Sequence, residues 1–154
     1  MPGSRACMDD PVLTLEPADG DTLPYVEALL EENGLPSADV RSKPGCFHVA
    51  FADGERVGVG GVEVHGSAGL LRSLAVERSV RGRGFGTAIC ERLEAAARAD
   101  GVGTLYLLTT TAPGFFADRG YAGIERGEAP DAIRGTTEFA DLCPETAVPM
   151  RKRL

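Results

Sequence analysis

Residues 46–76 alternate apolar with small or polar positions in three short runs, which is the pattern of half-buried β-strands. In the first run Phe47, Val49 and Phe51 occupy every second position. The dipeptide Asp53-Gly54 then separates this run from the next, and it is a strong hairpin signal. We therefore expect these residues to form a three-stranded antiparallel meander.

Two segments repeat apolar residues at the spacing of an amphipathic helix. The first helix is expected over residues 21–32, with a stop at Asn33-Gly34. Its inward face comprises Leu23, Val26, Leu29 and Leu30. The second helix is expected over residues 86–100 and ends at Gly101. Its outward face comprises Glu91, Arg92, Glu94 and Arg98.

The segment at residues 104–109 is apolar at nearly every position, as in a strand that is covered on both faces. With the strand at 70–76 and the helix that follows, it predicts a βαβ unit with a parallel strand pair. Further elements are expected at residues 11–16 (strand), 113–119 (helix), 121–125 (strand), 128–143 (polar, with helical character) and 147–152 (strand). We predict one mixed α/β (α+β) domain over residues 11–154, preceded by a disordered leader over residues 1–10.

Composition and charge exclude several classes of protein. The chain has 154 residues and a formal net charge of −7, so the basic surface of a general nucleic-acid-binding protein is not expected. No apolar stretch approaches the roughly 20 residues that span a bilayer, and the N-terminus lacks the apolar core of a signal peptide. The four cysteines have no paired spacing, so neither a zinc site nor a disulfide framework is predicted. We expect a cytoplasmic protein without metal, nucleic-acid or membrane partners.

Three alternating glycines lie between a predicted strand and a predicted helix, in the sequence Arg81-Gly-Arg-Gly-Phe-Gly-Thr87. Glycines let backbone N–H groups turn toward a ligand, and a helix start adds unpaired donors and a positive dipole end. Arg78, Arg81 and Arg83 add positive charge. The pattern indicates an anion cradle, and a glycine-rich turn with solvated arginines is the alternative.

The spacing of these glycines excludes two common phosphate-binding motifs. A P-loop requires a lysine after its last glycine, and this loop contains no lysine. The dinucleotide fingerprint begins directly after its strand with the spacing G-x-G-x-x-G. Here residues 77–80 intervene and the spacing is G-x-G-x-G.

A strand followed by Arg81-x-x-Gly84-x-Gly86 and an amphipathic helix resembles motif A of the GNAT superfamily of N-acetyltransferases, whose pattern is [Q/R]-x-x-G-x-[G/A]. The segment F-F-A-D-R-G-Y at residues 115–121 resembles the family's F-Y-x-x-x-G-[F/Y]. The likeness covers roughly residues 12–152. A narrower resemblance is to the small bacterial and archaeal branch of arsenic-resistance N-acetyltransferases. It is carried by residues 105–112, 115–116, 133–134, 138–144 and 150–152.

The resemblance implies acetyl-CoA as co-substrate. In the family the loop binds the pyrophosphate through backbone N–H groups. The preceding strand carries a bulge, splays from its parallel neighbour, pairs with pantetheine and polarises the thioester carbonyl. Thr109 replaces a frequent Asn, and Phe116 replaces a frequent Tyr that protonates the leaving thiolate. The implied cofactor contacts are Leu74, Ala75, Val76, Arg81, Gly82, Arg83, Gly84, Phe85, Gly86, Thr87, Thr109 and Phe116.

The candidate proton acceptors, Glu63 and His65, alternate to the same face of one predicted strand. Either could draw a proton from the attacking ammonium through water. The alternative is a solvated Glu63 and a His65 that belongs to the turn. Since the usual tyrosine is absent, either no acid is needed, because CoA thiolate is a tolerable leaving group, or another residue serves. Tyr106 and Tyr121 are the nearby tyrosines; Tyr121 is the candidate proton donor, and core packing is its alternative role.

Arg72 and Arg134 are the candidate clamps for a carboxylate or an arsonate-like group on the acceptor, because a guanidinium binds such groups bidentately. Arg72 lies two residues before Leu74 and is expected to share its face. An outward surface arginine is the alternative in each case.

Together these features predict an acetyl-CoA-dependent N-acetyltransferase that acts on the primary amine of a small molecule by direct attack in a ternary complex. An amino-acid-like toxin linked to arsenic resistance is one candidate acceptor. Two alternatives stay open: an enzyme that acetylates a protein or peptide, and a non-catalytic acyl-CoA-binding module. A homodimer is compatible with the sequence.

Overall fold

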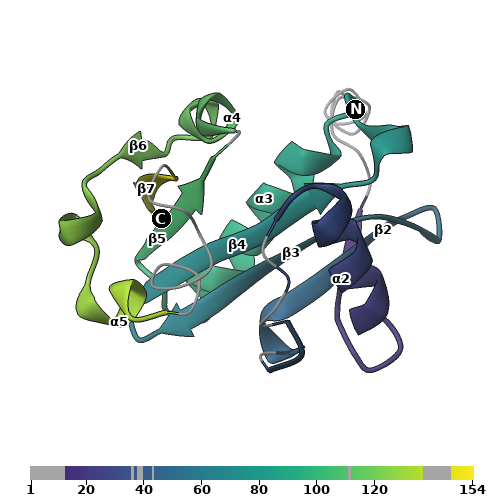
Figure 1. Cartoon of the computed structure of the whole chain (residues 1–154), viewed down its shortest axis with the longest axis horizontal. Helices are drawn as coiled ribbons and strands as arrows, with labels where there is room; N and C mark the ends of the chain where they lie inside the picture. Colours follow the sequence, from purple (N-terminus) through teal and green to yellow (C-terminus); the bar gives the residue numbers. More distant parts are fainter. Residues whose placement is uncertain (1–12, 36, 38–39, 43, 111, 137–146) are drawn as a thin grey trace, which may run out of the picture. The chain divides into compact units, whose positions relative to one another are not determined.

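The computed structural model describes residues 13–35, 37, 40–42, 44–110, 112–136 and 147–154. Within them, seven strands form a mixed sheet in the order β1-β2-β3-β4-β5-β7-β6 (Figure 1). The strands are β1 (Thr14–Pro17), β2 (Phe47–Ala52), β3 (Glu55–His65), β4 (Ala68–Val76), β5 (Thr104–Thr109), β6 (Ala122–Gly123) and β7 (Val148–Arg153). The α-helices of these residues are α2 (Leu23–Glu32), α3 (Phe85–Ala99), α4 (Pro113–Asp118) and α5 (Asp131–Arg134). The predicted mixed α/β fold is confirmed.

The hairpin at Asp53-Gly54 is confirmed as well. β2 and β3 pair antiparallel, and the two turn residues have φ angles of 53° and 80°. β4 is the next strand in the sheet, and Ala68–Leu70 pairs parallel with Thr104–Tyr106 of β5. This is the predicted βαβ unit. The expected leader over residues 1–10 and the last part of the polar stretch, residues 137–143, lie outside the described residues.

Contacts divide the chain into two compact units. The first unit contains residues 1–61 and 73–93, and the second contains residues 62–72 and 94–154. The divisions fall inside β3, β4 and α3, so each unit holds part of these three elements.

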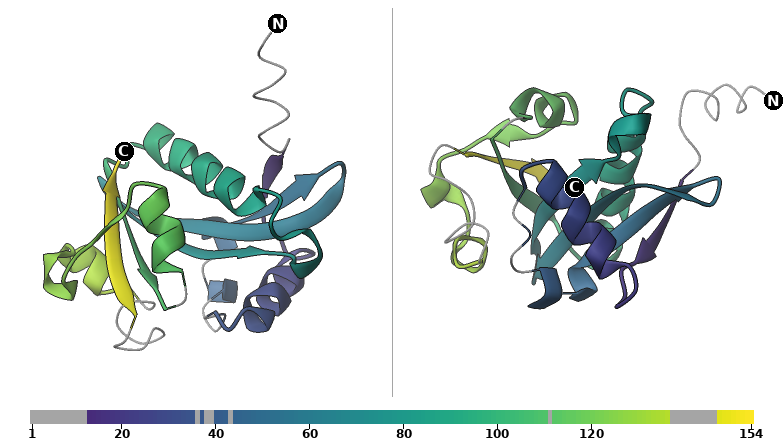
Figure 2. Two further views of the ribbon diagram at one scale, coloured as in Figure 1. Left: turned by 90° about the horizontal axis from the view of Figure 1, so that it is seen from above. Right: turned by 45° about the vertical axis from the view of Figure 1, so that its right-hand side comes forward.

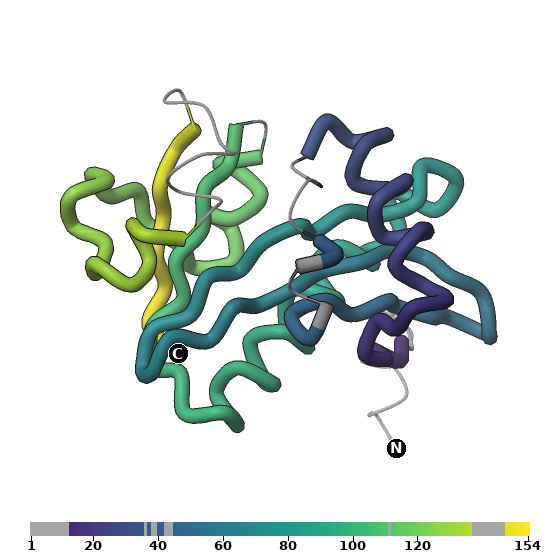
Figure 3. Tube along the Cα trace, turned by 60° about the horizontal axis from the view of Figure 1, so that its bottom comes forward, coloured from purple at the N-terminus to yellow at the C-terminus, as the bar shows by residue number. Residues whose placement is uncertain are grey.

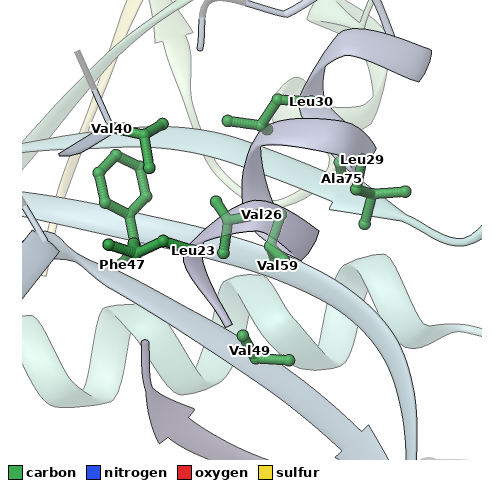
Figure 4. Close-up of a cluster of buried hydrophobic side chains, with 9 residues drawn as sticks. All are labelled: Leu23, Val26, Leu29, Leu30, Val40, Phe47, Val49, Val59 and Ala75. Carbon is green, nitrogen blue, oxygen red and sulfur yellow. The ribbon is translucent and has the colours of Figure 1, made fainter. Parts of the chain in front are cut away.

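The core of the first unit lies between α2 and strands β2 to β4 (Figure 4). The predicted inward face of α2 is buried, which confirms the helix and its orientation. The part of α3 in this unit covers the opposite face of the strands (Figure 2). A Cβ at Gly60 would lie only 2.6 Å from Leu93 Cδ1, so glycine permits this close approach. The core cluster comprises Leu23, Val26, Leu29, Leu30, Val40, Phe47, Val49, Val59 and Ala75.

His48 on β2 makes the stability of the first unit depend on pH. Burial lowers the pKa of His48 below its ordinary value, because surroundings of low dielectric constant disfavour the charged imidazole. Its Nδ1 atom is buried without a hydrogen-bond partner among the described residues. The unfolded chain therefore binds a proton at a higher pH than the folded chain does. The free energy of unfolding should fall as the pH drops below about 6.5.

Urea unfolding of the wild type and of His48→Gln at about pH 7.5 and about pH 5 measures this effect. The variant should lose less stability than the wild type between the two conditions, because glutamine does not titrate. Equal losses in the two proteins would contradict a buried neutral imidazole.

In the second unit, β5 and β7 pair antiparallel from Thr104 opposite Arg153 to Thr109 opposite Val148 (Figure 3). A second hydrophobic cluster joins β4 and β5 to α5 and to the residue two positions before it. The cluster comprises Leu70, Tyr106, Ala129 and Ile133. A Cβ at Gly69 would lie 2.9 Å from Leu105 Cδ2, so the parallel pair also relies on a glycine for its close packing.

Candidate active site

The glycine-rich segment at residues 81–87, called the anion loop below, connects a short 3-10 helix (Arg78–Val80) to α3. Gly82 and Gly84 have φ angles of 83° and 84°, a conformation that residues with a Cβ rarely adopt. The first helical hydrogen bond runs from the Ala88 N–H to the Gly84 carbonyl, at 3.1 Å. The N–H groups before Ala88 therefore have no partner in the helix ladder, and they mark the positive end of α3.

This geometry fits an anionic group. Gly82 and Gly84 are exposed, and a Cβ at Gly82 would meet nothing within 4 Å, so the approach to the backbone is open. Arg83 is also exposed and adds a positive charge beside the N–H donors. A helix start with left-handed glycines is a common cradle for phosphate.

Both the backbone and the side chain of Arg81 form hydrogen bonds within the protein. Its backbone N–H donates to the Arg78 carbonyl at 3.4 Å, and its Nε donates to the Val76 carbonyl at 3.2 Å. Its Nη2 donates to Asn33 Oδ1 at the end of α2. The sequence pattern marked Asn33 only as a helix stop. No pattern in the sequence predicts this contact, because the two residues lie 48 positions apart.

β4 contains an irregular residue, Ser73, with a φ angle of 62°. This left-handed conformation agrees with the bulge that the family resemblance implies. The expectation that Arg72 and Leu74 share a face assumed regular alternation through residue 73. Ser73 interrupts that alternation, so the premise of the expectation was wrong.

Beyond Ser73, the side chains of β4 belong to the first unit. Ala75 is buried in the cluster with α2, whereas Leu74 Cδ1 lies 3.6 Å from the Cβ position of Gly60, beside α3 residues. Residues 74–76 end β4 and are separated from the anion loop by Glu77 and the 3-10 helix, and their pantetheine contact stays a prediction.

Glu63, Arg72 and His65 form an ionic cluster in the second unit. Arg72 Nη1 donates to Glu63 Oε2 at 2.7 Å, and His65 Nε2 lies 3.4 Å from Glu63 Oε1. Glu63 and Arg72 are 4% and 3% exposed, so the alternatives of a solvated glutamate and an outward arginine were wrong. His65 is half-buried, with a side chain that is 32% exposed. A carboxylate and an imidazole are both groups that can serve as a general base, so Glu63 and His65 stay the predicted proton acceptors.

Removing one partner of this buried ion pair should be costly. Arg72→Met leaves the Glu63 carboxylate without its closest cation, and we expect the free energy of unfolding to fall by about 3 kcal/mol. Urea unfolding near neutral pH measures the loss. The double variant Arg72→Met/Glu63→Leu should recover part of it, because it removes the buried carboxylate that Arg72→Met leaves without this partner.

The exposed pair of Arg41 with Glu27 provides a matched control. Its closest contact is 2.9 Å, and the side chain of Arg41 is 62% exposed. Arg41→Met should therefore cost less than about 1 kcal/mol. Equal losses for Arg72→Met and Arg41→Met would contradict the buried character of the first pair.

Tyr121, the candidate proton donor, lies in a second polar group. Its hydroxyl donates to Glu94 Oε2 at 2.9 Å, and Lys152 Nζ lies 3.0 Å from Glu94 Oε1. Glu94 was expected on the outward face of its helix, and this was wrong, because these two partners allow its burial at 7% exposure. The ring of Phe116 packs edge-on against Tyr121, with centroids 5.6 Å apart. These contacts favour a packing role, and the catalytic role of Tyr121 stays a prediction.

Thr109 and Arg134 also have partners within the second unit. The Thr109 hydroxyl accepts a hydrogen bond from the Ala112 N–H at 3.0 Å, at the start of α4. Arg134 pairs with Asp131 one turn earlier in α5, and its side chain is 47% exposed. Their predicted contacts with pantetheine and with the acceptor stay predictions.

The described residues contain no group of three or more His, Cys, Asp or Glu side chains that could hold a metal ion. In the same part of the chain, no helix combines the length and the apolar character needed to cross a membrane.

Residues 43–122 match the family model of the acetyltransferase (GNAT) domain. The chain belongs to this family. The matched region runs from just before β2 to the first residue of β6, and it contains both the anion loop and the cluster of Glu63, Arg72 and His65.

Among curated proteins, a 61-residue stretch covering 38% of the chain is 46% identical to an amino-acid acetyltransferase of Azotobacter vinelandii. The corresponding identity to an amino-acid acetyltransferase of Pseudomonas putida is 44%. The match spans only 14% of the length of each relative.

Two solved structures show the same fold. N-acetylglutamate synthase from Neisseria gonorrhoeae, complexed with coenzyme A and N-acetyl-glutamate, aligns with a TM-score of 0.80 and 22% identity, over 94% of this chain and 36% of that chain. A Mycobacterium tuberculosis protein in complex with CoA and NLQ aligns with a TM-score of 0.77 and 24% identity, over 92% and 99% of the two chains.

Proposed function

We propose that this domain is an acetyl-CoA-dependent N-acetyltransferase that acts on the amino group of a small, amino-acid-like molecule. The observation that carries the proposal is the anion loop, with two left-handed glycines at the start of α3, inside the region that matches the GNAT acetyltransferase family. The amino-acid acetyltransferase relatives support the choice of acceptor class.

In this proposal the anion loop holds the pyrophosphate of acetyl-CoA. The N–H groups of residues 82–87 supply donors, and Arg83 supplies charge. Arg81, by contrast, holds the loop in place. The backbone of residues 74–76 pairs with pantetheine, and one of its N–H groups polarises the thioester carbonyl. Thr109 and Phe116 remain contacts implied by the family resemblance.

The reaction needs a neutral amine at the moment of attack. The amine nitrogen forms a bond to the thioester carbon, the carbon–sulfur bond breaks, and CoA leaves as a thiolate that takes a proton from solvent or from a nearby acid. Glu63, paired with His65, accepts the proton that the ammonium loses. No acyl-enzyme forms, because the amine attacks directly when both substrates are bound.

An α-amino acid would bring a carboxylate that needs a cation. Arg134 is the more accessible of the two proposed clamps, since its side chain is 47% exposed whereas that of Arg72 is fully buried beside Glu63. The narrower resemblance to arsenic-resistance acetyltransferases adds an amino-acid-like arsenical to the acceptors worth testing.

A screen for thiol release tests the proposal. The purified protein is incubated with acetyl-CoA and a panel of α-amino acids, an amino-acid-like arsenical, polyamines and short peptides. Release of CoA with an α-amino acid or its arsenical analogue is the expected result. Release of CoA only with peptides would make the acceptor a peptide and not a small amino-acid-like molecule. Saturable CoA binding without release of CoA for any amine would favour an acyl-CoA-binding module.

A further inference from the structure

Two side-chain contacts join α2 to the segment that carries the anion loop, one near each end of the helix. Near its start, the Tyr25 hydroxyl donates to Glu77 Oε2 at 2.6 Å. Just past its end, Asn33 Oδ1 accepts from Arg81 Nη2. Glu77 and Arg81 flank the 3-10 helix that leads into the loop, so the loop is tied to α2 at two points.

The Asn33 amide serves two elements at once. Its Nδ2 donates to the Leu29 carbonyl at 2.8 Å and so caps the last turn of α2. Its Oδ1 holds the guanidinium of Arg81, whose Nε also donates to the Val76 carbonyl at 3.2 Å. The guanidinium therefore bridges the end of β4 and the end of α2, and it does so with a planar fork that lysine cannot reproduce.

The hydrogen bond between Tyr25 and Glu77, near the start of α2, depends on a protonated phenol. The Tyr25 hydroxyl is half-buried, and burial together with the hydrogen bond to Glu77 raises the pKa of Tyr25 well above its ordinary value. The phenol therefore keeps its proton and stays a donor. Arg56 lies over the Tyr25 ring, with its guanidinium carbon 4.8 Å from the ring centre.

We propose that α2 is the scaffold that holds the anion loop in its binding conformation, and that Arg81 is a positioning residue which does not itself bind phosphate. The inference rests on the proposed function, because it concerns the same loop. A loop with glycines at residues 82, 84 and 86 has much conformational freedom to lose on binding. Anchors at Glu77 and Arg81 restrict that freedom before the ligand arrives, and such preorganisation raises affinity.

The test uses Asn33→Ala, Arg81→Ala and the double variant in the whole chain. Asn33 carries no charge, so a loss of CoA affinity in Asn33→Ala reports on the anchor. Each single variant should weaken CoA binding about five- to tenfold in calorimetric titration, and the double variant should be no weaker than Arg81→Ala. Arg81→Lys should behave like Arg81→Ala, because it keeps the charge but loses the fork.

Hydrogen exchange without ligand provides an independent readout. Amides of residues 77–86 should exchange faster in Asn33→Ala and in Arg81→Ala than in the wild type, while those of β5 and β7 should not change. Arg41→Ala is the matched control, since it removes an arginine that contacts α2 at Glu27 away from the loop. It should change neither CoA affinity nor exchange at residues 77–86.

Two results would overturn the inference. Full affinity in Asn33→Ala with a loss in Arg81→Ala that Arg81→Lys restores would make Arg81 a direct phosphate ligand. Unchanged exchange at residues 77–86 in both alanine variants would show that the anchor does not order the loop. Failure of the wild type to bind CoA would overturn the proposed function instead, and the exchange result alone would then decide whether α2 holds the loop.

Discussion

Replacing Gly84 with glutamate should weaken acetyl-CoA binding by about 100-fold or more. Two effects act together. The φ angle of 84° at this residue strains any side chain that has a Cβ, which moves the N–H donors at the start of α3. The new carboxylate also places a negative charge next to the phosphate position. Calorimetric titration with acetyl-CoA measures the loss, and circular dichroism checks that the variant is folded.

Gly54→Glu is the control for this prediction. Gly54 lies in the hairpin turn after β2, has a φ angle of 80° and has nothing within 4 Å of its Cβ position. The substitution therefore introduces the same backbone strain and the same charge away from the anion loop. It should leave acetyl-CoA affinity unchanged. If Gly54→Glu and Gly84→Glu lost affinity equally, or if neither did, the loop would not be the acetyl-CoA site.

Glu63→Gln should lower kcat by about 100-fold or more with the best acceptor amine, while the affinity for acetyl-CoA stays close to the wild-type value. Glutamine keeps the shape of the side chain and an oxygen that can accept from Arg72, but it cannot take up the ammonium proton. Steady-state kinetics at saturating acetyl-CoA measure the loss. A more alkaline buffer should restore part of the rate, because more of the acceptor amine is then already neutral.

Glu55→Gln is the matched control, since Glu55 begins the same strand and is exposed. Its kcat should equal that of the wild type. A Glu63→Gln variant with wild-type kcat at neutral pH would remove Glu63 from the mechanism and leave His65 as the remaining candidate base.

Elements that depend on short-range patterns could be predicted from the sequence. The hairpin at Asp53-Gly54 follows from turn chemistry, and the buried face of α2 follows from helical periodicity. The position of the anion loop could also be predicted from its glycine spacing, because the positive φ angles of residues 82 and 84 favour glycine.

Features that depend on pairing between distant residues could not be predicted in this way. Glu94 has the helical position of a surface residue, yet it is buried because Lys152, 58 residues later, neutralises it. Arg72 and Glu63 likewise bury each other's charge on neighbouring strands. The break at Ser73 has no glycine or proline to mark it. For Glu94 and for the pair of Arg72 and Glu63, the deciding contact is between different elements of the fold.

The proposed function depends on the binding of acetyl-CoA by the anion loop. Calorimetric titration of the wild-type protein with acetyl-CoA, repeated with Gly84→Glu, tests it most directly. We expect saturable one-to-one binding by the wild type at concentrations below about 1 mM, and its loss in the variant. No saturable binding by the wild type at that concentration, or equal binding by both proteins, would contradict it.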